Sequence, residues 1–195
     1  MAKGEETRKR IVSRTAALLN KQGYLGTPVS EIMRVVGLQK GGLYRHFESR
    51  AALTEEAFEY AVARMRDRLL QAIQGEKTAT EKLLSLVDVT RNAMDDEIYR
   101  GGCPIQNLAV ESDDADPKLR ELARAAMTRL VGLIERLIRE GIDRGEFVAG
   151  DAHARAIWMA ASIEGAIMLS NLYKDRSHME VVTDHLTRTV RSGFR

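Results

Sequence analysis

Residues 29–47 constrain the fold of this chain more than any other stretch, because they hold two short helical patterns separated by a glycine. The first pattern has four apolar residues at i, i+3, i+4 and i+7, which is one face of a helix: Val29, Ile32, Met33 and Val36. Gly37 follows, where a left-handed residue ends a helix at little cost. A second helix is expected over 40–47, with Leu43 and Phe47 facing inward. The stretch therefore predicts a helix-turn-helix.

Gly41 and Gly42 stand near the start of the second helix. Each glycine costs about 1 kcal/mol relative to alanine inside a helix. That cost favours a backbone that another surface approaches closely, such as a phosphate or a base edge, with Lys40 supplying positive charge. The alternative is a flexible loop that contains two glycines.

The motif resembles a known family. Residues 39–53, Gln-Lys-Gly-Gly-Leu-Tyr-Arg-His-Phe-Glu-Ser-Arg-Ala-Ala-Leu, are similar to the recognition helix and the next helix start of the tetracycline-repressor (TetR) family. The similarity extends over residues 7–55. It implies a homodimeric DNA-binding transcriptional regulator, usually a repressor that a small-molecule effector releases from a palindromic operator. Gly42 departs from the family, which often has threonine or serine there.

The resemblance also implies which residues contact double-stranded DNA. Four positions match phosphate contacts: Thr27, Tyr44, His46 and Arg50. Four match positions near base edges: Gln39, Lys40, Gly41 and Arg45. Glutamine can pair with adenine, and lysine or arginine with guanine. The Tyr44 and His46 rings could instead support helix packing.

Charge is divided unevenly along the chain. Residues 1–50 carry ten Lys and Arg against four acidic residues, a net charge of +6, and the other 145 carry twenty against twenty-four, or −4. A positive segment around the motif suits a nucleic-acid reader. The basic residues early in the first helix, Arg8, Lys9, Arg10 and Arg14, are either a solvated face or phosphate contacts.

Composition favours an all-α globular fold of about nine helices. The chain has 195 residues, 44% hydrophobic and 30% charged, and only three prolines. We expect a DNA-binding domain over residues 1–48 and an effector-binding and dimerisation domain over 49–195. Besides the motif, helices are expected over 5–22, 49–74, 79–97, 105–110, 117–144, 151–172 and 183–192. Expected helix caps are Thr27 or Ser30, Ser49 and Asp151.

Helices eight and nine are the expected dimer interface. The face of the eighth has two small residues, Ser162 and Gly165, that allow close helix approach, and it also carries Ile157, Ala160, Ala161, Glu164, Ala166, Ile167 and Met168. The ninth adds Val181, Val182, Leu186 and Val190. A monomer core is the alternative. Glu164, which lies within this apolar face, would need a partner, such as Arg155 or a residue across the dimer axis.

An effector pocket is expected among the central helices. Its candidate lining residues are Phe58, Met65, Met94, Tyr99, Cys103, Trp158 and Ile163. Each could equally be a core residue, and no charge pattern identifies the ligand.

Cys103 supports an alternative function. The run from Gly102 to Glu111 is similar to a subgroup of the family in which some members sense oxidants or electrophiles through this cysteine, and a helix N-terminus lowers a thiol pKa. The alternative to the effector-released repressor is therefore a thiol-based redox sensor. The cysteine could also be buried and inert.

Other classes receive less support. The chain lacks a phosphate-binding glycine loop, HExxH and CxxC motifs and metal-ligand spacing of its four histidines, so we expect no catalytic residue, cofactor or metal. A single cysteine and no signal-like start suggest a cytoplasmic protein. Residues 156–173 are long enough for a membrane helix, but Glu164 interrupts them. A helical ligand-binding protein without DNA function is a further alternative.

Overall fold

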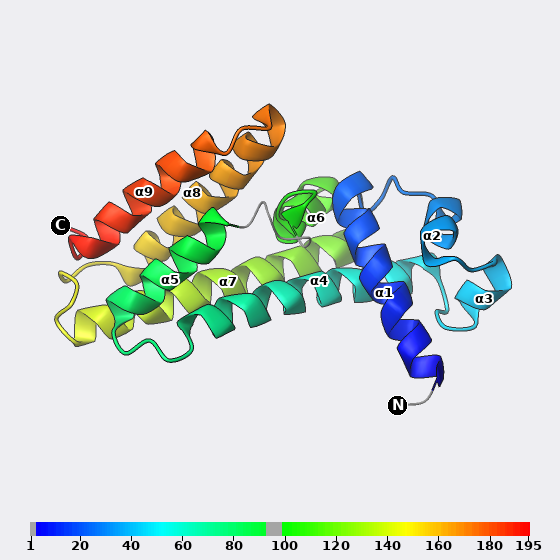
Figure 1. Cartoon of the computed structure of the whole chain (residues 1–195), viewed down its shortest axis with the longest axis horizontal. Helices are drawn as coiled ribbons and strands as arrows, with labels where there is room; N and C mark the ends of the chain where they lie inside the picture. Colours follow the sequence, from blue (N-terminus) through cyan, green and yellow to red (C-terminus); the bar gives the residue numbers. More distant parts are fainter. Residues whose placement is uncertain (1–2, 93–98) are drawn as a thin grey trace. The chain divides into compact units, whose positions relative to one another are not determined.

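The computed structural model describes residues 3–92 and 99–195, and in these ranges the chain forms nine α-helices and no strand (Figure 1). The helices are α1 Lys3–Gln22, α2 Val29–Val36, α3 Lys40–Tyr44, α4 Arg50–Ile73, α5 Ala79–Arg91, α6 Pro104–Ser112, α7 Pro117–Asp143, α8 Ala152–Tyr173 and α9 Ser177–Arg191. The predicted all-α class is confirmed. No helix of the described chain is both long and apolar enough to cross a membrane.

Two compact units make up the structure. The head unit contains the described residues of 1–65 and 97–123, and the body unit those of 66–96 and 124–195. Residues 99–123 therefore group with the N-terminal helices, although the two segments are far apart in sequence. The expected domain boundary after residue 48 stays a prediction.

The head unit buries one side of each of its helices. Ile11 and Leu19 of α1, Ile32 of α2, and Leu53 and Phe58 of α4 are all buried. The rings of Phe58 and Tyr24 meet edge-on, with centroids 5.9 Å apart. This packing fixes α1 against the helix-turn-helix.

Helix ends follow the sequence in most places. The Ser49 hydroxyl accepts a hydrogen bond from Ala52 N–H at 3.0 Å, and Asp151 Oδ1 accepts one from Ala154 N–H at 3.0 Å, as predicted. The expected cap of α2 is wrong. Its N-cap residue is Pro28, and no side chain caps this helix, because the Thr27 hydroxyl donates to the Gly23 carbonyl instead.

Some helix lengths differ from the prediction. The structure ends α3 at Tyr44 instead of Phe47, and α9 begins at Ser177, six residues before the expected start. The end expected for the fifth helix, near residue 97, lies outside the described residues.

In the body unit, α8 and α9 run side by side, and α5 also packs against α9 (Figure 1). The Glu146 carboxylate accepts hydrogen bonds from the N–H groups of Ala79 and Thr80 at 3.1 and 2.8 Å, so it caps α5 from outside that helix. Arg155 donates to the Val148 carbonyl at 2.8 Å. It therefore has partners other than the Glu164 considered above.

Candidate nucleic-acid interface

The turn between α2 and α3 is built as the sequence predicts. Gly37 has a φ of 72°, and its N–H donates to the Met33 carbonyl at 3.0 Å. The Leu38 N–H donates to the same oxygen at 3.1 Å. This left-handed end turns the chain sharply. The side chains that hold the two helices inward are Ile32, Val36, Leu43 and Phe47, all buried.

The outer side of α3 carries most of the residues expected to contact DNA. Four of them are exposed: Gln39, Lys40, Gly41 and Arg45. The Tyr44 side chain is 37% exposed, and His46 is half-buried. A Cβ built on Gly41 would meet no atom within 4 Å, so packing within the chain does not require glycine there. Open space over a helix backbone is what close approach by a duplex needs.

Thr27 and Arg50 have partners inside the head unit. Thr27 is 2% exposed, and its hydroxyl donates to the Gly23 carbonyl at 2.6 Å. Arg50 Nη2 donates to the carbonyl oxygens of Tyr24, Leu25 and Thr27 at 2.8, 3.0 and 2.9 Å. In this conformation both side chains stabilise the α1–α2 turn, residues 23–28.

Two of the basic residues of α1 also bind within the head unit. Arg8 donates to the Glu56 carboxylate and to the His46 carbonyl oxygen, and its guanidinium lies 4.3 Å from the centre of the Phe47 ring. Arg14 donates to a carbonyl oxygen of α2 at 3.2 Å. These contacts tie α1 to the helix-turn-helix.

The candidate effector residues are divided between the units. Phe58, Met65, Tyr99 and Cys103 belong to the head unit and are buried there. Trp158 and Ile163 belong to α8 in the body unit, and Met94 lies outside the described residues. Phe58 packs on Tyr24 in the head core.

Tyr24 marks a closely packed region next to α6. Burial raises the pKa of the Tyr24 hydroxyl well above its ordinary value, and the negative charges that Cys103 and Glu111 can carry raise this pKa further. Its environment therefore favours the neutral phenol.

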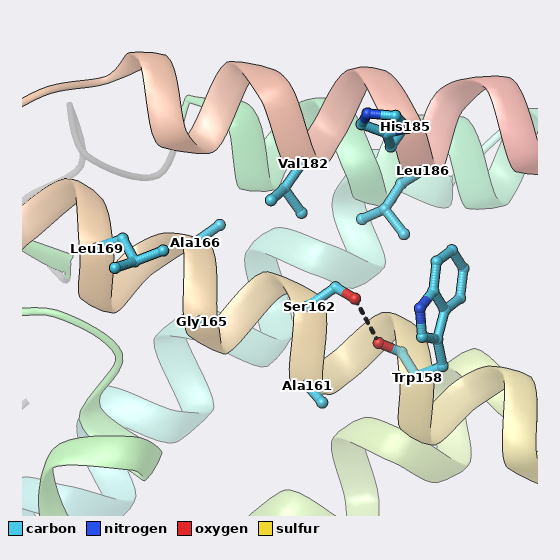
Figure 2. Close-up of a pocket in the computed structure, with 9 residues that line it drawn as sticks. All are labelled: Trp158, Ala161, Ser162, Gly165, Ala166, Leu169, Val182, His185 and Leu186. Atoms are coloured by element: carbon cyan, nitrogen blue, oxygen red, sulfur yellow. Dashed lines mark hydrogen bonds between the residues drawn. The ribbon is translucent and has the colours of Figure 1, made fainter.

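A hollow of about 320 Å³ lies between α8 and α9 in the body unit (Figure 2). Its lining residues are Trp158, Ala161, Ser162, Gly165, Ala166, Leu169, Val182, His185 and Leu186. The Ser162 hydroxyl donates to the Trp158 carbonyl at 2.8 Å, so it is already bonded. Trp158, one of the candidate effector residues, is 45% exposed at this hollow.

The same two helices expose an apolar face. Its large exposed members are Ile157, Trp158, Met168 and Leu172 of α8 and Val181 of α9. Ala160, Ala166 and Ile167, which the sequence grouped with this face, are buried in the body unit instead. A contiguous exposed apolar patch usually marks an interaction surface.

Comparisons with known proteins agree with this architecture. Residues 11–57 match the family model described as bacterial regulatory proteins, tetR family, and residues 79–186 match the model of a tetracyclin repressor-like C-terminal domain. A crystal structure of a TetR transcriptional regulator from Chloroflexus aurantiacus superposes with a TM-score of 0.92 at 41% identity, covering 97% of this chain and 96% of that one.

Two curated relatives extend the comparison. An uncharacterised HTH-type transcriptional regulator of Mycobacterium tuberculosis is 30% identical over 182 residues, which cover 90% of this chain and 89% of the relative. The HTH-type transcriptional repressor NemR of Escherichia coli K12 is 22% identical over 172 residues, 85% of this chain and 86% of NemR.

A basic helix-turn-helix joined to further helices, with no strand among the described residues, defines a helix-turn-helix transcriptional regulator. The chain belongs to the TetR family of these regulators.

Proposed function

We propose that this regulator is a homodimeric, cytoplasmic repressor that binds a palindromic operator. A small-molecule effector would release the repressor from DNA. The observation that carries the proposal is the outer side of α3, where a tyrosine, two cations and an open glycine lie together over a buried Leu43 and Phe47. The relative NemR is itself named as a repressor, which supports the sign of regulation.

The residues of α3 divide by the chemistry they offer to DNA. Gln39, Lys40 and Arg45 are exposed donors at the start and end of α3 and would read base edges in the major groove. Tyr44 and His46 would hold phosphates beside that groove. Arg50 and Thr27 would contribute by holding the α1–α2 turn, with phosphate contact as a second role.

Dimerisation would pair the apolar face of α8 and α9 with its copy. A single helix-turn-helix makes too short a contact for useful specificity, whereas two heads about 34–36 Å apart read successive major grooves. The exposed Ile157, Met168 and Leu172 give α8 the apolar surface that such a four-helix interface requires. The hollow lined by Trp158 and His185 would then be closed by the partner or filled by its side chains.

Release by an effector requires that the effector bind one arrangement of the dimer more tightly than the other. The candidate residues remain those named from the sequence, of which Phe58, Met65 and Tyr99 are buried in the head unit. A screen for compounds that release the protein from its duplex would identify the effector.

Selection of bound sequences from a random duplex pool tests the proposal, followed by gel shifts with the best duplex. Tyr44→Ala should weaken binding at least tenfold. Tyr60→Ala is the matched control, because Tyr60 of α4 is 38% exposed against 37% for Tyr44. Full affinity in the Tyr44 variant, or equal losses in both, would refute the role given to α3.

The thiol-sensor alternative has a separate test. Cys103 is 1% exposed and is the residue just before Pro104 at the start of α6, so an oxidant would reach it only after local opening. Operator release by peroxide in the wild type but not in Cys103→Ser would establish the sensor. Equal release in both would exclude it.

A further inference from the structure

The backbone of the α1–α2 turn, residues 23–28, is held by charged side chains from two other helices. The Glu111 carboxylate of α6 accepts hydrogen bonds from the N–H groups of Tyr24 at 3.0 Å and Leu25 at 2.9 Å. Arg50 of α4 donates to the carbonyl oxygens of the same two residues. Backbone N–H and C=O groups in a turn lack the regular hydrogen bonds of a helix or a strand. The Glu111 and Arg50 side chains provide hydrogen bonds to these groups instead.

Gly23 allows the carboxylate to come this close. It has a φ of 102°, and a Cβ at this position would lie 3.1 Å from Glu111 Oε2. The turn is therefore shaped for contact with α6 as well as for reversing the chain.

An amide pair anchors α6 to the end of α1. The Asn107 amide donates to the main-chain and side-chain oxygens of Asn20 at 3.1 and 2.9 Å and to the Gly101 carbonyl at 2.9 Å. The Asn20 amide donates in turn to the Gly102 carbonyl at 2.9 Å. Asn107 and Glu111 are four residues apart, on one face of α6. The hydrogen bonds that hold α6 against α1 therefore also place the Glu111 carboxylate at the turn.

The turn leads directly into the helix-turn-helix. Pro28, the last residue of the turn, is the N-cap residue of α2, so the backbone of the turn sets the direction in which α2 starts. A displaced turn would move α2, and with α2 the outer side of α3. Glu111 itself is anionic and is repelled by phosphate, so any benefit it brings to DNA binding must act through the turn.

We propose that Glu111 is a positioning residue for DNA binding, which fixes the α1–α2 turn and so the orientation of α3 without touching DNA. Asn107 shares this role because it seats α6 on α1. The DNA readout of this inference rests on the proposed function above. The state of the turn can be measured without DNA.

Amide hydrogen exchange, followed by NMR on the full chain, tests the turn. The Tyr24 and Leu25 amides should exchange at least 100-fold more slowly than in an unstructured peptide. Glu111→Gln should accelerate both at least tenfold, because an amide side chain offers one acceptor oxygen and turns a donor toward the other N–H. Unprotected amides in the wild type would overturn the inference, and so would unchanged protection in the variant.

Binding to the duplex selected by the wild type tests the consequence for DNA. Glu111→Gln and Asp114→Asn each remove one negative charge from the same acidic segment, and Asp114 is exposed. Charge alone predicts tighter binding in both variants. Positioning predicts at least tenfold weaker binding for Glu111→Gln only, with an unchanged salt slope because no phosphate contact is lost.

Glu111→Asp keeps both carboxylate oxygens and should restore part of the affinity. If Glu111→Gln does not fold, as judged by circular dichroism, Glu111→Asp takes its place. The inference then predicts that Glu111→Asp binds the duplex at least threefold more weakly than the wild type and that the Tyr24 and Leu25 amides of the wild type are protected. Undiminished binding by Glu111→Gln, or by Glu111→Asp in that case, overturns this inference alone. A wild type that enriches no duplex refutes the proposed function instead, and leaves the exchange result to judge the turn.

Discussion

Arg50 is the residue whose replacement should affect the head unit most directly. Its Nη2 lies 2.8–3.0 Å from three carbonyl oxygens of the α1–α2 turn. In Arg50→Leu these oxygens lose a charged donor, and a leucine cannot replace it. We therefore expect the turn to loosen and the head unit to lose stability.

The size of the loss follows from the number of hydrogens. One Nη2 carries two, so the three contacts count as two shared hydrogen bonds with a charged donor. Such bonds contribute about 1.5–3 kcal/mol each, and the lower value applies because the side chain is only half-buried. The expected decrease in the free energy of unfolding is about 3 kcal/mol.

Urea unfolding followed by circular dichroism, at one fixed protein concentration, measures this loss. Arg45→Leu is the matched control, since it removes the same charge from the exposed residue that follows α3 and should change stability by less than about 0.5 kcal/mol. The two variants should also differ in how they affect DNA binding. Arg45→Leu should change base preference, whereas Arg50→Leu should weaken all sequences alike. Equal unfolding midpoints for the two variants would refute the structural role given to Arg50.

Three further outcomes are expected. Gly101→Ala should lower stability by about 2–3 kcal/mol in thermal unfolding, because its Cβ would lie 1.9 Å from the Asn20 carbonyl oxygen. The control Gly132→Ala in α7 should be neutral or stabilising. A neutral Gly101→Ala would contradict the packing described. Burial raises the pKa of Glu146, but hydrogen bonds from the start of α5 lower it more, so its net pKa lies below the ordinary value. Its stabilisation is thus present at neutral pH and is lost as pH falls through that lowered pKa, and the stability difference between wild type and Glu146→Gln should shrink as urea titrations move from about pH 6 to about pH 3. Leu172→Glu should convert the proposed dimer to monomers in sedimentation velocity, and an unchanged sedimentation coefficient would exclude α8 from the interface.

Local signals in the sequence predicted much of the helix-turn-helix and the N-caps of α4 and α8. The spacing of Ile32 and Val36, the glycine at 37 and the caps at Ser49 and Asp151 all depend on neighbours within four residues, and the structure agrees with them. Patterns of this kind carry their own geometry, because a helix repeats every 3.6 residues.

The contacts of the turn depend instead on residues far apart in sequence. Glu111 stands in an acidic run that suggests a solvated loop, and its partners Tyr24 and Leu25 lie 87 and 86 residues away. Arg50 and Thr27 were assigned to phosphate by family resemblance, and no local pattern indicates that their polar atoms bind the turn. Gly23 is the local residue that fits a close contact at the turn, but Glu111, the residue that makes this contact, lies far away in the sequence.

The exposure of Trp158 is a different case. Trp158 is large and apolar, so it suggested a pocket lining among central helices, yet its side chain is exposed beside α9. Burial of a helix face depends on which neighbour covers it, and apolar spacing alone does not tell a chain's own core from a surface reserved for a partner.

The grouping of residues 99–123 with the described residues of 1–65 determines which part of the chain is needed to produce or transfer the DNA-binding head unit. A fragment that stops soon after α3 would lack Glu111 and Asn107. The N–H groups of its α1–α2 turn would then lose the Glu111 carboxylate and be exposed to water. During synthesis the reader would likewise stay incomplete until more than half of the polypeptide has been made. Chimeric regulators built by exchanging N-terminal segments should therefore carry α6 of the donor protein as well.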